Sequence, residues 1–214
     1  MSAPLARSAL HASGLQCVRG NRRVFDGVAF DLANGGLLQV RGPNGSGKTS
    51  LLRIVCGLIQ PAAGSIEWNG RPIHALGEEY HQDLAYFGHL NALKDELKAG
   101  ENLRFCARLA GVPATQALIG AALREFAVDG LAHLPCKFLS QGQKRRLALA
   151  RLRLSGTRAV WVLDEPFAAL DAAGIEVIRL VIEEHLERGG LVLLTSHQEV
   201  AIAAHAIQSI ELKS

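Results

Sequence analysis

The segment GPNGSGKT, from Gly42 to Thr49, is the part of the sequence that decides the fold class. It matches the pattern G-x-x-x-x-G-K-S/T, in which glycines let successive backbone N–H groups turn inward around phosphate oxygens. An apolar run from Leu37 to Val40 precedes it, and residues 49–59 carry apolar side chains at helical spacing. The pattern therefore predicts a strand, a phosphate-binding loop and a helix whose positive N-terminal end faces the same anion.

The residues of this segment have separate expected roles toward a nucleotide. Lys48 would reach the β- and γ-phosphates, and the hydroxyl of Thr49 would ligate Mg²⁺. The predicted nucleotide-binding residues here are Gly42, Pro43, Asn44, Gly45, Ser46, Gly47, Lys48, Thr49 and Ser50. Because kinases, GTPases and motor ATPases all use such a loop, the class of enzyme depends on the rest of the chain.

Two adjacent acids end a second buried strand further along the chain. Residues 159–163 form an apolar run that suits a central parallel strand, and Asp164 and Glu165 follow it directly. The two carboxylates can play different roles: Asp164 would hold the Mg²⁺ shell, and Glu165 would polarise the attacking water. Two such acids could also form an ordinary turn at a strand end, but the phosphate loop upstream favours the catalytic interpretation.

Strand patterns occur on both sides of the phosphate loop. Residues 10–32 alternate between apolar and polar, with turn signals at Gly20-Asn21 and Asp26-Gly27, so we expect antiparallel strands there. Residues 66–73 have the pattern of an edge strand. Two further apolar runs, at 83–87 and 191–195, indicate buried strands.

Helical patterns fill the middle and the last third of the chain. Residues 93–139 suggest a helical subdomain inserted into the sheet domain, with expected helix starts at residues 101–103 and 113–114. Ser140 is expected to cap a helix over 141–154, and Asp171 a helix that ends before Gly189-Gly190. Strands alternating with helices predict an α/β fold with a largely parallel sheet.

Three motifs in the second half resemble those of ABC ATPases. Leu139-Ser140-Gln141-Gly142-Gln143 resembles the LSGGQ signature, which places a serine and an accessible glycine at a helix N-terminus, although alone it could be an ordinary capped helix. Ala168-Ala169-Leu170-Asp171 resembles the D-loop, and Thr195-Ser196-His197 resembles the switch-histidine segment. With the phosphate loop and the Asp–Glu pair in the same order, these motifs identify the chain as a member of the ABC ATPase family.

This resemblance implies a fold, cofactors and an assembly. The fold would be α/β, a P-loop NTPase with an ABC-type nucleotide-binding domain that spans 1–214 as a single domain. It would contain an antiparallel β subdomain and, at approximately 91–139, the inserted helical subdomain. ATP and Mg²⁺ would be the cofactors, with Thr49 and Asp164 on the metal.

The resemblance also implies a homodimer that closes on ATP and opens on hydrolysis. Each ATP would lie between one subunit's Gly42–Thr49 loop and the other subunit's signature, formed by Ser140, Gln141, Gly142 and Gln143. Asp171 would be the D-loop residue. His197 would contact the γ-phosphate and complete the catalytic set of Glu165, His197 and Lys48.

The sequence departs from the usual ABC pattern at three positions. Arg19 stands where most ABC domains have an aromatic side chain against adenine, and because a guanidinium plane can also stack on a base, we expect weaker base selectivity. His89 stands where the Q-loop glutamine is expected, and it could sense Mg²⁺ or water with a dependence on pH. Gln141 replaces a signature glycine. These changes concern rate and coupling more than ATP binding.

A narrower resemblance comes from three stretches of the chain. The run from Tyr80 to Leu103, the signature LSQGQKRR and the ending GGLVLLTSHQEV are similar to the haem exporter ATP-binding family (CcmA) of bacterial cytochrome c maturation. The resemblance implies a peripheral subunit on the cytoplasmic face of the bacterial inner membrane, with integral-membrane permease partners that are CcmB- and CcmC-like. ATP hydrolysis would then power release of a haem-loaded chaperone.

The same resemblance suggests how the subunit would meet its permease, so that it would contact the membrane through its partners. The docking segment would lie between His89 and Phe138. Its candidate contacts, which could instead pack within the helical subdomain, are Leu90, Leu93, Leu97 and Phe105.

Composition narrows the remaining possibilities. A net charge of +3 does not call for a nucleic-acid partner, and the one basic concentration, between Lys144 and Arg158, is expected to be the solvated face of a helix. The 4 cysteines are far apart, which favours reduced thiols over a disulfide or a zinc site. Neither a signal peptide nor an apolar run of about 20 residues is present, so we expect a chain that is neither secreted nor membrane-spanning.

Alternatives to the haem exporter stay open on the sequence alone. An ABC subunit for another transported substrate would share the same chemistry, because the motor domain does not touch the cargo. A soluble nucleic-acid-associated ABC ATPase would usually carry a coiled coil or a second ATPase domain, which 214 residues do not accommodate. A small-molecule kinase would have no use for the signature or for His197.

Overall fold

A computed structural model describes residues 8–155 and 158–213, which form two compact units. Unit 1 consists of the described residues within Met1–Gly88, Arg158–Pro166 and Ile182–Ser214. Unit 2 consists of those within His89–Thr157 and Phe167–Val181. The chain therefore passes twice from unit 1 into unit 2 and back, and the expected helical segment 91–139 lies within unit 2.

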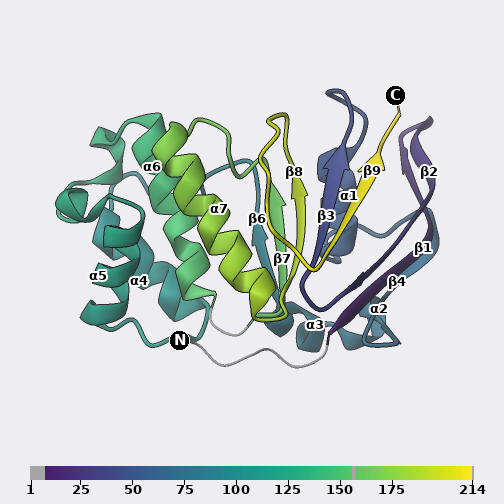
Figure 1. The fold of residues 1–214 in the computed structure, drawn as a ribbon, viewed down its shortest axis with the longest axis horizontal. Helices are drawn as coiled ribbons and strands as arrows, with labels where there is room; N and C mark the ends of the chain where they lie inside the picture. Colours follow the sequence, from purple (N-terminus) through teal and green to yellow (C-terminus); the bar gives the residue numbers. More distant parts are fainter. Residues whose placement is uncertain (1–7, 156–157, 214) are drawn as a thin grey trace. The chain divides into compact units, whose positions relative to one another are not determined.

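A parallel sheet forms the centre of unit 1 (Figure 1). In spatial order its strands are β6 (Leu84–Phe87), β7 (Val160–Asp164), β8 (Leu191–Thr195), β3 (Gly36–Arg41) and β9 (Ala206–Glu211). Every residue of β7 and β8 is buried. Because strands covered on both faces need continuous apolar runs, the strands predicted over residues 159–163 and 191–195 are confirmed.

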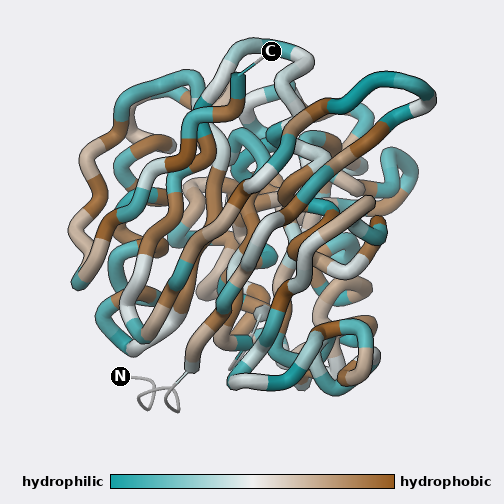
Figure 2. Tube along the Cα trace, turned by 90° about the vertical axis from the view of Figure 1, so that its right-hand side faces the viewer, coloured by the Kyte–Doolittle hydropathy of each residue, from teal (hydrophilic) through white to brown (hydrophobic). Residues whose placement is uncertain are grey.

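An antiparallel sheet with the order β2-β1-β4-β5 forms the other part of unit 1. Its strands are β1 (Ala9–Arg19), β2 (Arg22–Ala33), β4 (Ala63–Trp68) and β5 (Arg71–Pro72). Hydrophobic and hydrophilic residues alternate along β1 and β2, as Figure 2 shows, which places one face of the sheet on the core.

One turn prediction and one strand prediction in this sheet are wrong. Asp26-Gly27 lies inside β2, where the pairing with β1 shifts register and Gly27 adopts a φ of +68°, so the glycine serves a bulge rather than a turn. The edge strand expected over residues 66–73 is a hairpin, because Asn69 (φ 52°) and Gly70 (φ 75°) form the positive-φ turn that Asn-Gly favours. The turn predicted at Gly20-Asn21 is confirmed.

Helix α1 (Lys48–Val55) follows the phosphate loop and is shorter than the sequence predicts. The helix ends at Gly57, which has a φ of +69°. The N–H of Gly57 donates to the carbonyl of Ile54, and the N–H of Leu58 donates to the carbonyl of Arg53. The apolar side chains of the helix are buried in the core of unit 1. After β4 and β5 come the short helices α2 (Ile73–Leu76) and α3 (Glu78–Asp83).

Unit 2 is helical in its described part. It contains α4 (Ala99–Leu109), α5 (Gln116–Glu125), α6 (Gln141–Leu149) and the 3₁₀ segments η1 (Asp129–Leu131), η2 (Cys136–Phe138) and η3 (Ala150–Leu154). Helix α7 (Ala172–Glu187) begins in unit 2 and ends in unit 1. The helix starts predicted at 101–103 and 113–114 are wrong in detail, because Lys98 and Thr115 are the N-cap residues of α4 and α5.

Two further features concern the apolar character of the helices and the cysteine side chains. In the part of the chain that the structure describes, no helix has both the length and the apolar character to cross a membrane. Cys17, Cys56, Cys106 and Cys136 are free thiols, and burial raises the pKa of Cys56 to about 12.

Candidate nucleotide-binding site

The phosphate loop connects β3 to α1 and depends on glycine at particular points. Gly42, Gly45 and Gly47 have φ values of 139°, 82° and 99°, which L side chains rarely adopt. A Cβ on Gly47 would lie 2.4 Å from Cγ1 of Val24, and one on Gly42 would lie 2.4 Å from the carbonyl oxygen of Leu212. At Gly42 and Gly47 the loop therefore packs directly against Leu212 and β2, with no room for a side chain, whereas at Gly45 only the backbone conformation favours glycine.

Two polar side chains of the loop are oriented toward its interior. The Lys48 ammonium donates to the carbonyl oxygens of Gly42 (2.8 Å) and Pro43 (3.2 Å). The Ser46 hydroxyl is 1% exposed and has no hydrogen-bond partner among the described residues. A buried hydroxyl without a partner costs roughly 1–3 kcal/mol, so this site fits a ligand that supplies one, such as a phosphate oxygen.

The aspartate at the end of β7 receives hydroxyl donors from two neighbouring elements. Thr49 Oγ1 donates to Asp164 Oδ2 (2.9 Å), and Thr195 Oγ1 donates to Asp164 Oδ1 (2.8 Å). The Asp164 residue is 3% exposed. A carboxylate and a hydroxyl are the oxygen ligands that Mg²⁺ prefers, so Thr49 and Asp164 fit a bound Mg²⁺.

Glu165, the next residue, is held in an unusual conformation. Its φ is 52°, and its N–H donates to Thr195 Oγ1 at 2.9 Å. Its carboxylate accepts the N–H of His197 (3.2 Å) and lies 3.5 Å from Nε2 of the same residue. The strands β7 and β8 thus bring Asp164, Glu165 and His197 together, as expected from parallel strands that end at one edge.

Thr195 is the member of this group for which the sequence predicts no role. It links Asp164 to the backbone of Glu165 and is fully buried. The sequence signal that could have indicated its role is a polar residue at the end of an apolar strand, beside a second strand that ends in acidic residues.

Arg19 is also brought to the phosphate loop. It ends β1, and its Nη2 donates to the hydroxyl of Ser50 at 3.3 Å. Ser50 follows Thr49 in the first turn of α1. The side chain of Arg19 is therefore adjacent to the loop, although the two are far apart in sequence.

The signature and D-loop residues lie together in unit 2. Ser140 caps α6, as predicted: its Oγ accepts the N–H of Gln143 (3.2 Å), and Gln143 Oε1 accepts the N–H of Ser140 (2.9 Å). A Cβ on Gly142 would lie 3.2 Å from the carbonyl of Ala169 in the D-loop. The exposed residue Gln141 begins the helix.

Asp171 connects the D-loop to the signature helix. Its carboxylate pairs with the guanidinium of Arg146 on α6 and accepts the N–H of Gly174 at 3.0 Å, so it caps α7 as predicted. The hydrogen bond from Arg146 holds the pKa of Asp171 below its usual range. The signature and the D-loop are thus parts of one local structure.

The prediction that the basic concentration forms a solvated helix face is wrong. Arg145 is 5% exposed, and it donates to Asn91 Oδ1 (3.2 Å) and to the carbonyl of His89 (3.5 Å). Lys144 pairs with Asp95 at 2.8 Å. These cations hold the segment that contains His89 against α6, and the His89 side chain is exposed.

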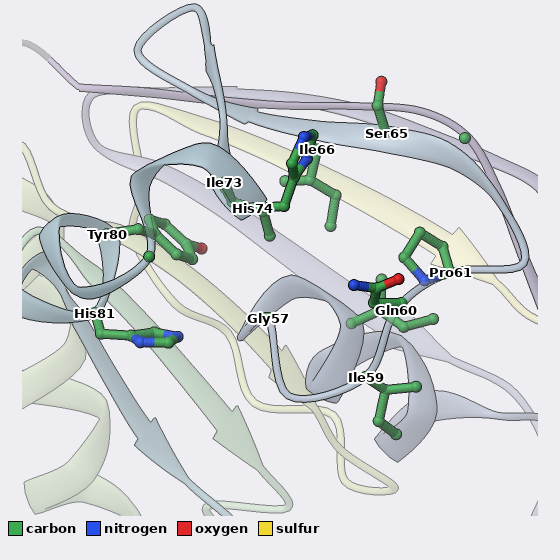
Figure 3. A pocket seen from close by; sticks show the side chains of 13 residues that line it. Gly57, Ile59, Gln60, Pro61, Ser65, Ile66, Ile73, His74, Tyr80 and His81 are labelled. Carbon is green, nitrogen blue, oxygen red and sulfur yellow. The ribbon is translucent and has the colours of Figure 1, made fainter.

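A cavity of about 500 Å³ lies at the C-terminal end of α1, away from the phosphate loop (Figure 3). Two of its lining side chains satisfy the last carbonyls of α1: Tyr80 donates to Val55 O (2.9 Å), and His81 Nε2 lies 3.1 Å from Cys56 O. Burial raises the pKa of Tyr80, so its hydroxyl stays protonated as a donor. The lining contains none of the predicted nucleotide-binding residues.

Solved structures of ABC transporter ATP-binding proteins share this fold. A putative ABC transporter ATP-binding protein from Pyrococcus furiosus is 26% identical, with a TM-score of 0.80, over 94% of this chain and 96% of that one. A structure of an ATP-binding subunit of an ABC transporter is 26% identical, with a TM-score of 0.77, over 88% of this chain and 79% of that one. The ABC transporter family model matches residues 25–168. Fold and site together define an ABC-type P-loop NTPase that binds and hydrolyses ATP.

Several relatives are similar over nearly the whole chain. The cytochrome c biogenesis ATP-binding export protein CcmA of Nitrosospira multiformis is 49% identical over 203 residues, which are 95% of this chain and 98% of the relative. The protein of the same name from Dechloromonas aromatica is 47% identical over 95% of this chain and 99% of the relative. That of Haemophilus influenzae is 44% identical over 89% and 90%. The chain belongs to this CcmA family.

Proposed function

We propose that the chain is the ATPase subunit of a membrane exporter in bacterial cytochrome c maturation, and that its ATP hydrolysis powers release of a haem-loaded chaperone. The observation that carries the proposal is identity of up to 49% with cytochrome c biogenesis export proteins along almost the full length of both chains. The geometry around the phosphate loop supports the ATPase part independently.

The proposed nucleotide site is the segment from Gly42 to Ser50. Backbone N–H groups of the loop bind the phosphates, and Lys48 turns from its carbonyl partners to the β- and γ-phosphates. Thr49 and Asp164 would hold Mg²⁺, which when bound neutralises charge on the triphosphate. The Ser46 hydroxyl gains the partner that it lacks.

For hydrolysis we assign the proton-accepting role to Glu165. A water oxygen attacks the γ-phosphorus, its proton passes to the Glu165 carboxylate, and the bond to the β–γ bridging oxygen breaks to release ADP. His197 donates a hydrogen bond to the γ-phosphate. Thr195 positions both acids, because it bonds to Asp164 and to the N–H of Glu165.

We further propose that the subunit works as a homodimer. Ser140 and Gln141 are exposed at the N-terminus of α6, where backbone N–H groups and the helix dipole attract an anion. They would contact the γ-phosphate of ATP held by the partner's loop, next to Gly142, Gln143 and Asp171. His89 would instead sense Mg²⁺ or water at the nucleotide held by its own subunit.

The proposed membrane partners are CcmB- and CcmC-like permease subunits, which would keep the chain on the cytoplasmic face of the inner membrane. Exposed apolar side chains in unit 2 support a docking surface: Leu90 is 82% exposed and Phe105 is 41% exposed. Leu93 and Leu97 are half-buried, so they contribute less to such a surface. Phe138 and Leu109 are exposed as well.

The test replaces the chromosomal gene by one that encodes Lys48→Ala. Holocytochrome c should be lost while total haem is unchanged, and the variant should still co-purify with the permease subunits. Normal holocytochrome c in a strain whose subunit no longer hydrolyses ATP would refute the export role and leave an ABC subunit for another substrate.

A further inference from the structure

The indole of Trp161 and the imidazole of His185 form a stacked pair inside unit 1. Their ring centroids lie 3.9 Å apart at an interplanar angle of 7°, and the two residues are 4% and 3% exposed. Trp161 belongs to β7, and His185 lies in the last turn of α7. A Cβ on Gly190 would lie 2.1 Å from Nε2 of His185, so only glycine at that position leaves room for the ring.

The pair lies where the two central strands begin. Nε2 of His185 lies 3.2 Å from the carbonyl oxygen of Ala159, which also accepts the N–H of Leu191 at 2.8 Å. Ala159 directly precedes β7, and Leu191 is the first residue of β8. The same two strands end at Asp164 and Thr195, so the imidazole secures the end of α7 to the strands that carry the proposed catalytic group.

The surroundings of the ring favour its neutral form. Burial lowers the pKa of His185 from 6.5 to about 4, and the charge of Arg188, which follows α7, acts in the same direction. Hydrogen bonds with the backbone of Ala159 and Leu191 oppose this shift only in part. The strands otherwise contribute the indole of Trp161, which does not titrate. An indole face attracts a cation, but this attraction does not replace the hydration that a buried imidazolium loses.

We propose that the Trp161–His185 pair is a pH-sensitive switch, which holds the end of α7 on β7 and β8 while the imidazole is neutral and releases it in mild acid. In the unfolded chain the imidazole gains its proton at its ordinary pKa of 6.5, whereas in the folded subunit it does so only near 4. The contribution to stability is therefore complete above the unfolded pKa and is lost progressively as the pH falls below it. The switch belongs to the ATPase fold and is independent of the transported substrate.

The experiment compares urea unfolding of the full chain at about pH 7.5 and about pH 5 for the wild type and His185→Phe. Phenylalanine keeps an aromatic ring against Trp161 but has no proton to gain, and the Ala159 carbonyl keeps the N–H of Leu191. Between the two pH values, the unfolding equilibrium constant should rise about thirtyfold more in the wild type than in the variant, as the two pKa values of His185 require. Ring chemical shifts should show a neutral His185 in the folded wild type at about pH 5.

Two further variants separate the charge of the ring from its packing. His185→Gln removes the stack and cannot gain a proton, so it should unfold more readily than the wild type at neutral pH. Its response to pH should nevertheless be as weak as that of His185→Phe. His133→Phe is the matched control, because it replaces an exposed imidazole by the same ring, and its response should equal that of the wild type.

Three results would overturn the inference. An equal pH response in the wild type and His185→Phe would assign the acid sensitivity to other titrating groups. A response reduced as much by His133→Phe would mean that any histidine has this effect. A charged His185 in the folded wild type at about pH 5 would show that the stack tolerates the proton. If His185→Phe does not fold, the pH response of His185→Gln and the ring chemical shifts of the wild type decide the question.

Discussion

The helices α1 and α6 both begin with a serine- and glycine-containing turn, yet their N-termini are built differently. In the described part of the chain, α1 follows Gly47 without a side-chain cap. Helix α6 follows Ser140, which forms a reciprocal capping box with Gln143. The first N–H groups of α1 are therefore available to a ligand, whereas side chains within α6 already accept part of the N–H groups at its start.

The difference indicates how each helix can take part in ATP binding. At the C-terminal end of α1, Tyr80 and His81 contact the last carbonyls, and the N–H of Gly57 bonds back to the helix. Because these contacts stabilise the helix, its N-terminus does not need a side-chain cap. To bind a phosphate, α6 must replace a hydrogen bond of its own capping box by one to the phosphate. We therefore expect α1 to bind nucleotide alone and α6 to act only on nucleotide that a partner subunit presents.

The largest expected effect comes from Glu165→Gln, which separates holding the nucleotide from cleaving it. Loss of the proton acceptor should lower the hydrolysis rate by about 10²–10⁴-fold, while ATP affinity at α1 stays close to that of the wild type. Uncleaved ATP should then keep dimers closed, which size-exclusion chromatography with and without ATP would detect. A variant that hydrolyses at the wild-type rate would remove Glu165 from the proposed mechanism.

The next effect concerns the lysines in the first turns of the two helices. Lys48→Ala removes a cation from the phosphate loop and should weaken ATP binding by about 10- to 100-fold, the range expected for a charged hydrogen bond. Lys144→Ala removes a cation that pairs with Asp95, so ATP affinity of the isolated subunit should not change. Equal losses in calorimetric titrations of the two variants would contradict the assignment of nucleotide binding to α1.

The elements around α1 were predictable because local sequence dictates them. The strand, the glycine loop and the start of α1 each depend on neighbouring residues, and the buried strands β7 and β8 are uninterrupted apolar runs. The Asp–Glu pair and His197 follow those runs directly. Where the prediction placed helix or strand ends wrongly, the determining feature was one or two residues, such as Gly57 or the pair Asn69-Gly70.

Long-range contacts could not be inferred from the pattern of residues. Thr195 meets Asp164 only because β7 and β8 are neighbours in register, and Arg19 meets Ser50 only because the first hairpin packs on the phosphate loop. Arg145 has the sequence environment of a surface cation, but unit 2 buries it beside Asn91. Strand β9 escaped prediction because most of its residues are exposed.

A smaller effect should follow from Tyr80→Phe, which tests the C-terminal anchoring of α1. The variant leaves the buried carbonyl of Val55 without its hydroxyl donor, so the free energy of unfolding should fall by roughly 1–3 kcal/mol. Because the N-terminus of α1 is untouched, the dissociation constant of ATP should change by less than about twofold. Urea unfolding and calorimetry on the same preparation measure both quantities. If the free energy of ATP binding fell by more than the free energy of unfolding, the two ends of α1 would be coupled.

The smallest effect on the folded subunit is expected from Ser140→Ala, which removes the cap of α6. The free energy of unfolding should fall by about 1 kcal/mol, and ATP binding to the isolated subunit should persist, since the signature would contact only a partner's nucleotide. In the Glu165→Gln background, the same change should prevent the ATP-dependent dimer. Ser140→Asp separates the two roles, because its carboxylate still caps the helix but repels a γ-phosphate. Stable subunits that nevertheless fail to dimerise with ATP are expected. Dimers formed as readily as with Ser140 would place the signature outside the nucleotide interface.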